Sequence, residues 1–186
     1  MNLLRGPARL ALKLLGWKLL DLPQRPANAV VIAYPHTSNW DFPVTLLALA
    51  ALPFGAHWVG KDTMFRGILG PIMRALGGVS VNRRERTGFV QRLADEFRRR
   101  EGFHLIIATE GTRSRQAGWK SGFYRIALTA KVPVIMSVVD YARREVGLLA
   151  SLTLSGDEAA DMATIAACYE GRTGFHPENA SPIRLL

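Results

Sequence analysis

Short apolar runs alternate with helical segments along this chain, and that alternation constrains its fold more than any other feature. Ala29–Tyr34 is continuously apolar and bounded by prolines, which is typical of a strand covered on both faces. Thr87–Arg100 instead repeats its apolar residues at the period of a helix. The same criteria predict strands at 56–60, 79–81, 104–108, 132–139 and 146–154, and helices at 41–52, 121–130 and 157–169. Residues 64–76 are expected to form one or two short helices, broken at Gly67 and at Gly70-Pro71. The pattern predicts an α/β fold: a single domain with a mostly parallel central sheet flanked by helices on both faces.

The N-terminus is expected to carry an amphipathic helix. Residues 1–25 are assigned to this membrane-associating segment, and residues 26–186 to the domain. A proline in the first turn and leucines at helical spacing predict a helix over Pro7–Leu20. Its apolar face would hold Leu3, Leu10, Leu14 and Trp17, and its basic face Arg5, Arg9 and Lys13. Such a helix can lie in a membrane interface; a surface helix packed on the domain is the alternative.

The net charge of +9, from 24 basic and 15 acidic residues, indicates a polyanionic partner. A nucleic-acid binder is one candidate, and it predicts aromatic residues among the basic ones or a known binding module. The arginine-rich stretch 83–100 holds only Phe89 and Phe97, and Phe97 faces inward by its periodicity. An anionic membrane surface is therefore the favoured partner, and a basic nucleic-acid-binding protein remains the alternative. The single cysteine, Cys168, excludes an internal disulfide and fits a reducing compartment.

Polar stretches follow three of the predicted strands directly: His36–Asp41, Asn82–Arg86 and Glu110–Arg115. In a parallel sheet, ligands bind outside the carboxyl ends of the strands. The three stretches are therefore expected to converge at one edge of the sheet.

His36 and Asp41 have the spacing of a His–Asp pair. The carboxylate would accept one imidazole N–H and stabilise the imidazolium, and the other ring nitrogen could act as a general base. Asp41 could instead cap the helix that begins there. No Gly-x-Ser-x-Gly motif accompanies the pair, and Cys168 is remote in sequence. A substrate hydroxyl would then be the nucleophile, which fits direct acyl transfer from a thioester.

The other two stretches suit anions. Arg83 leaves a strand end and could bind phosphate bidentately, although a solvated charge run is the alternative. Gly111 permits a tight turn, whose backbone N–H groups could receive an anion together with Arg113; a polar surface turn is the alternative there. No spacing of His, Cys, Asp and Glu predicts a metal site.

Together these stretches resemble the glycerolipid acyltransferase family, which includes the lysophosphatidic acid and glycerol-phosphate acyltransferases. The resemblance covers roughly residues 29 to 139 and rests on four blocks in the family's order: His36-Thr-Ser-Asn-Trp-Asp41, which matches its His-x4-Asp motif, Gly78-Val-Ser-Val-Asn82-Arg83, Glu110-Gly-Thr-Arg-Ser114 and Val132-Pro-Val-Ile135. The resemblance implies transfer of a fatty acyl group from acyl-CoA or acyl carrier protein to the hydroxyl of a lysophospholipid, with lysophosphatidic acid as the default acceptor.

The resemblance also implies roles for individual residues. His36 would be the general base and Asp41 would orient it. The acceptor site would be formed by Arg83 and Arg113, which would hold the phosphate, and by Glu110, Gly111 and Thr112. The acyl thioester is a co-substrate, so no cofactor is expected. The protein would act as a peripheral enzyme at the cytoplasmic face of a membrane.

Two positions depart from the family's pattern. Thr109 stands where the family usually has a proline before its third block, and Met136 stands where its fourth block often has one. Both lie in segments that shape the acceptor and acyl sites, so the acceptor headgroup and acyl length stay open. A non-catalytic lipid-binding protein on the same fold is an alternative, and so is a hydrolase that uses water in place of the lipid hydroxyl.

Overall fold

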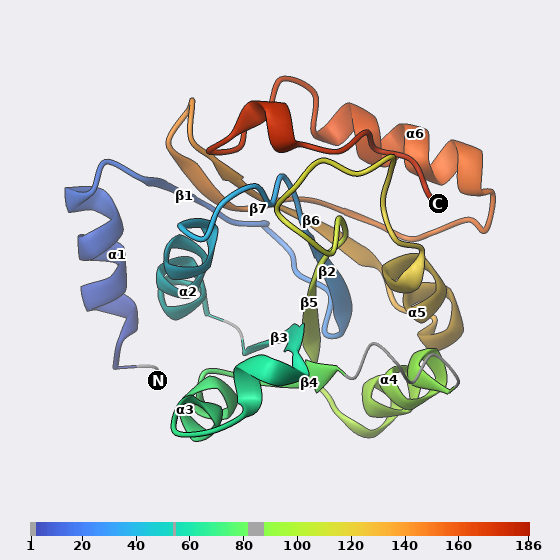
Figure 1. The fold of residues 1–186 in the computed structure, drawn as a ribbon, viewed down its shortest axis with the longest axis horizontal. Coiled ribbons are helices and arrows are strands. Elements are labelled where there is room, and N and C mark those ends of the chain that lie inside the picture. Colours follow the sequence, from blue (N-terminus) through green and yellow to red (C-terminus); the bar gives the residue numbers. More distant parts are fainter. Residues whose placement is uncertain (1–2, 54, 82–87) are drawn as a thin grey trace.

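A computed structural model describes residues 3–53, 55–81 and 88–186. Within them seven strands form one sheet in the order β1-β7-β6-β2-β5-β3-β4 (Figure 1). The strands are β1 (Lys18–Leu20), β2 (Ala29–Ala33), β3 (Ala56–Lys61), β4 (Gly78–Val81), β5 (His104–Ala108), β6 (Val134–Asp140) and β7 (Glu145–Leu152). Neighbouring strands are parallel except for the β6–β7 hairpin. The predicted single α/β domain with a mostly parallel sheet is confirmed.

Helices cover both faces of this sheet, as predicted (Figure 1). The helices are α1 (Arg5–Leu14), α2 (Asp41–Ala51), α3 (Leu69–Ala75), α4 (Phe89–Arg99), α5 (Gly122–Ala130) and α6 (Glu158–Cys168), with short 3₁₀ helices η1 (Asp62–Phe65) and η2 (Pro177–Asn179). In β2, Val30 and Ile32 join the core shared with α4, α5 and α6, whereas Ala29 and Val31 join the core on the opposite face, with α2 and η1. Successive side chains of a strand point to opposite faces, which explains why β2 is apolar throughout.

The predicted helix over Pro7–Leu20 is wrong in its second half. The helix α1 ends at Leu14, and Gly16, with φ +76°, turns the chain away. The N–H groups of Gly16 and Trp17 donate to the carbonyls of Lys13 and Leu12, the paired bonds of a Schellman motif. Residues 18–20 then form β1, which pairs in parallel with β7. A glycine after a helical run was the signal in the sequence that marked this end.

The buried and exposed side chains of this segment also differ from the predicted ones. Ala8 and Leu12, neither of them on the predicted apolar face, are buried in a core shared with α2. Trp17 is buried and packs edge-on against Tyr141, with ring centroids 5.1 Å apart, so it does not reach toward a membrane. The remaining leucines of the predicted apolar face are exposed, namely Leu3, Leu10 and Leu14.

The pairing of β1 with β7 depends on a glycine. At Gly147 φ is +136°, and a Cβ there would lie 2.0 Å from the carbonyl oxygen of Leu20. We expect Gly147→Ala to displace β1 and to lower the free energy of unfolding by about 3 kcal/mol, through backbone strain and overpacking. Urea unfolding measures this loss.

Gly156→Ala is the matched control for that substitution. Gly156 also has a positive φ, +90°, but apart from its own chain neighbours no described residue has an atom within 4 Å of the position its Cβ would take. The expected loss is about 1 kcal/mol, from backbone strain alone. Equal losses in the two variants would contradict the close contact with β1.

Candidate active site

His36 and Asp41 meet at the carboxyl end of β2. His36 lies in the loop that follows this strand, and Asp41 is the first residue of α2. Nδ1 of His36 is 3.1 Å from Oδ2 of Asp41. Asp41 does not cap α2: the helix has no side-chain cap, and its carboxylate turns back toward the preceding loop. The pair expected from the spacing is therefore formed.

The loop between them holds the Asp41 carboxylate in place. Oδ2 accepts hydrogen bonds from the backbone N–H groups of Thr37 and Ser38, each at 2.9 Å. Asp41 is 3% exposed, whereas the His36 side chain is 24% exposed. Because Asp41 engages Nδ1, Nε2 is the ring nitrogen that can accept a proton from a substrate. The geometry is that of a general base oriented by a buried carboxylate.

Glu110 supports the same loop from the neighbouring strand. It follows β5, which pairs with β2, and it is only 1% exposed. Oε2 accepts from the His36 N–H at 2.8 Å, and Oε1 accepts from the Ser181 N–H at 2.7 Å. Burial raises the pKa of Glu110, and these backbone donors oppose the rise. Both carboxylate oxygens are thus occupied by the protein itself, and the predicted contact with an acceptor stays a prediction.

The remaining predicted acceptor residues lie just beyond Glu110. Gly111 makes a turn with φ +69°, and its N–H donates to the Ala108 carbonyl at 3.0 Å. Thr112 is half-buried and Arg113 is exposed. Nζ of Lys120 lies 3.0 Å from the position a Gly111 Cβ would take, so a lysine that the sequence analysis passed over lies against this turn. Its ammonium joins the anion-binding candidates of this loop.

Arg83 lies outside the described residues, as do Asn82, Arg84 and Arg86. Its predicted contact with an acceptor phosphate therefore stays a prediction. Among the residues that the structure does describe, no three His, Cys, Asp or Glu side chains gather in a way that could hold a metal ion.

The C-terminal segment completes the site, and the sequence analysis missed it. The His176 N–H donates to Thr37 Oγ1 at 3.1 Å, which ties the segment to the His36 loop. Ser181 donates its N–H to Glu110 and accepts from the Tyr34 hydroxyl through its carbonyl at 3.0 Å. These contacts use mainly backbone groups, and backbone groups leave no pattern in a sequence.

A narrow apolar cavity of about 40 Å³ runs from this pair between α2 and the sheet. Beside His36 and Asp41, its walls include Val31, Ala48, Leu49, Leu52, Ile106, Val139 and Leu148. A volume of this size holds about three water molecules, so a long acyl chain would enter only if the walls moved apart. Its lining nevertheless places apolar surface directly beside the proposed base.

Comparisons with known proteins point to one class of reaction. The acyltransferase family model matches residues 20–139, a range that includes His36, Asp41 and Glu110. Among solved structures, the chain resembles the crystal structure of the 1-acyl-sn-glycerophosphate (LPA) acyltransferase PlsC from Thermotoga maritima, with a TM-score of 0.59 and 18% sequence identity over 90% of this chain and 76% of that one. At that identity the likeness shows the fold alone. Comparison with curated proteins gave no significant match.

The position of Glu110 predicts a mainly structural role. We expect Glu110→Gln to lower the free energy of unfolding by about 2 kcal/mol, because an amide offers an N–H group to one of the two backbone donors. Chemical unfolding measures this loss. Glu178→Gln is the matched control, because Glu178 lies in the same C-terminal segment with its side chain 70% exposed. Unchanged stability together with a raised KM for the acceptor would show that Glu110 binds substrate instead.

Proposed function

Because this chain belongs to the acyltransferase family, we propose that it transfers a fatty acyl group from acyl-CoA or acyl carrier protein to the hydroxyl of a lysophospholipid. The observation that carries the proposal is the His36–Asp41 pair, 3.1 Å apart at the carboxyl end of β2. Lysophosphatidic acid is the first acceptor to test, because the PlsC structure of similar fold is described as an LPA acyltransferase.

The geometry supports a mechanism of direct transfer. Nε2 of His36 removes the proton from the acceptor hydroxyl as its oxygen attacks the thioester carbonyl. Asp41 stabilises the imidazolium that forms, and the buried Oδ2 is already aligned with Nδ1. When the tetrahedral intermediate collapses, the C–S bond breaks, and the imidazolium returns its proton to the departing thiolate. The products are an ester and a free thiol.

The acceptor phosphate is proposed to bind beside the turn after β5. Arg113 is exposed there, and the Lys120 ammonium lies against Gly111, so two cations border this turn. Thr112, half-buried in the same turn, is proposed to add a hydroxyl donor. Arg83 is proposed to hold the same phosphate from the end of β4. Arginine and lysine differ in this role, since arginine binds phosphate bidentately and lysine as a point charge.

The protein is also proposed to bind an anionic membrane as a peripheral enzyme, at its cytoplasmic face. The helix α1 exposes Leu10 and Leu14, and leucines also stand exposed on either side of it at Leu3, Leu4 and Leu15. The net charge of +9 favours anionic lipids. In the described part of the chain, none of the helices has the length and apolarity needed to span a bilayer.

The proposed acyl transfer can be tested directly. Purified wild-type protein is expected to convert labelled acyl-CoA and one member of a lysophospholipid panel into a diacyl product, read by mass spectrometry, with acyl carrier protein as the second donor. His36→Gln is expected to lower kcat by at least about 1000-fold while leaving the unfolding free energy near that of wild type.

Two results in that assay would overturn the proposal. Equal product from wild type and His36→Gln would remove His36 as the base. Free fatty acid in place of a diacyl lipid would identify a hydrolase. His57→Gln is the matched control, because His57 lies on β3, outside the predicted site, and is expected to keep the wild-type kcat.

The proposed membrane binding can be tested with vesicles. Leu10→Asp and Leu14→Asp together should reduce cosedimentation with phosphatidylglycerol-containing vesicles by at least about tenfold, because each replaces inserted apolar surface by a charge that the anionic surface repels. Both leucines are exposed, so the fold should tolerate the changes. Leu186→Asp adds one such charge at another exposed leucine and serves as the control for Leu10→Asp and Leu14→Asp measured singly. An equal loss of binding in the control would show that the effect comes from net charge alone.

A further inference from the structure

The buried polar atoms that lack a hydrogen bond of standard geometry among the described residues include two near the His36–Asp41 pair. One is Oδ1 of Asp41, whose other oxygen accepts from two backbone N–H groups and faces the His36 imidazole. The other is the hydroxyl of Tyr141. Tyr141 follows β6, which pairs in parallel with β2, so both residues lie at the carboxyl edge of the sheet. Buried polar atoms are usually satisfied, so each of these two calls for a partner.

The two groups interact with each other. Burial raises the pKa of the Tyr141 hydroxyl, and the charge of the nearby Asp41 carboxylate raises that pKa further. Arg144, the nearby cation, acts in the opposite direction. A carboxylate that raises the pKa of a phenol in this way accepts a hydrogen bond from its neutral form. The phenol is therefore a donor within reach of the carboxylate that orients the base.

Packing holds the Tyr141 ring in this position. Trp17 and Phe175 both meet it edge-on, with centroids 5.1 Å and 5.0 Å away. The Tyr141 N–H donates to the carbonyl of Thr173 at 2.9 Å. The same segment reaches the loop of the catalytic pair, because the neighbouring His176 N–H bonds to Thr37. The ring is thus held by two segments that are far apart in the sequence.

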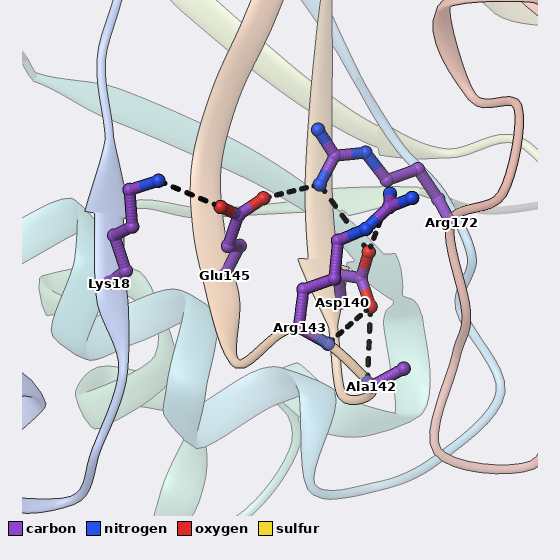
Figure 2. Close-up of polar contacts among 6 residues, drawn as sticks. All are labelled: Lys18, Asp140, Ala142, Arg143, Glu145 and Arg172. Atoms are coloured by element: carbon purple, nitrogen blue, oxygen red, sulfur yellow. Dashed lines mark hydrogen bonds and ion pairs between the residues drawn. The ribbon is translucent and has the colours of Figure 1, made fainter.

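An ionic network fixes the turn that carries Tyr141. Asp140 is fully buried, and its Oδ1 accepts from the Ala142 and Arg143 N–H groups at 3.1 Å each. Its Oδ2 lies 3.4 Å from Arg172, which also pairs with Glu145 (Figure 2). The network continues from Glu145 to Lys18 of β1 at 3.0 Å. Because these ion pairs join β1, the β6–β7 turn and the C-terminal segment, they hold together the elements that enclose the phenol.

We propose that Tyr141 is a positioning residue for the His36–Asp41 pair, its hydroxyl donating a hydrogen bond to Oδ1 of Asp41. With both carboxylate oxygens held, Oδ2 stays directed at Nδ1 of His36, and the ring keeps its proton on that nitrogen. Nε2 is then available as the base. The kinetic consequence rests on the proposed acyl transfer, whereas the hydrogen bond can be tested without it.

Tyr141→Phe tests this role, because it removes the hydroxyl and keeps the ring. Nitrogen-15 NMR of the His36 ring, recorded at a pH where it is neutral, reports which nitrogen carries the proton. Wild type is expected to show the Nδ1–H tautomer, and Tyr141→Phe a mixture of both tautomers. In the transfer assay kcat should fall about tenfold with both KM values unchanged, because the proposed role of the phenol is to orient the pair and not to bind a substrate.

Two other variants calibrate the experiment. Tyr124→Phe is the matched control, because the Tyr124 hydroxyl also donates to a buried aspartate, Asp161, at 2.8 Å but lies between α5 and α6. It should lower the melting temperature and leave the His36 tautomer and kcat unchanged. Asp41→Asn gives the spectrum of a pair whose carboxylate is lost altogether.

The proposal is overturned if Tyr141→Phe keeps the wild-type tautomer, whether or not its stability falls. It is also overturned if KM rises while kcat is unchanged, since Tyr141 would then contact a substrate. A wild type that transfers no acyl group would contradict the proposed function, yet the tautomer of His36 would still decide the hydrogen bond.

Discussion

The structure depends on buried carboxylates that are satisfied by backbone N–H groups. Taking an ionised carboxylate out of water costs several kcal/mol unless hydrogen bonds replace its hydration. Glu110 bonds the His36 loop to the C-terminal segment, and Asp41 bonds the loop that precedes it. Asp140 closes the β6–β7 turn, and Asp161 accepts a hydrogen bond from the backbone N–H of Ser155. Each carboxylate fixes a piece of irregular chain that has no partner in the sheet.

This arrangement has a direct consequence for catalysis. A general base works best when its orientation is set before the substrate arrives, because no reorganisation is then needed during the reaction. His36 has both of its attachments fixed: its N–H is bonded to Glu110 and its Nδ1 faces Asp41. In the proposed mechanism, stability and function therefore use the same side chains at this edge of the sheet, and loss of either carboxylate would disturb His36.

The N-terminal segment shows how a helix and a strand divide one amphipathic stretch. The turn at Gly16 divides the predicted apolar face, because it separates Trp17 from Leu10 and Leu14, and the chain then enters the sheet as β1. Trp17 thereby becomes a packing partner of Tyr141 rather than a membrane anchor. Leu10 and Leu14 stay exposed, because Ala8 and Leu12 occupy the side of α1 that packs against α2.

The sequence by itself determined the class of fold and placed His36 and Asp41 close enough to pair. Continuous apolar strands and periodic helices are local patterns, and a histidine five residues before an aspartate can meet it within one loop. Only the tertiary structure decided what surrounds that pair. Glu110 meets Ser181, and Tyr141 packs against Trp17 and Phe175, across separations in the chain at which no local spacing applies. Which backbone N–H a buried carboxylate accepts from depends on how the strands are ordered in the sheet, and the sequence carries no periodicity for it.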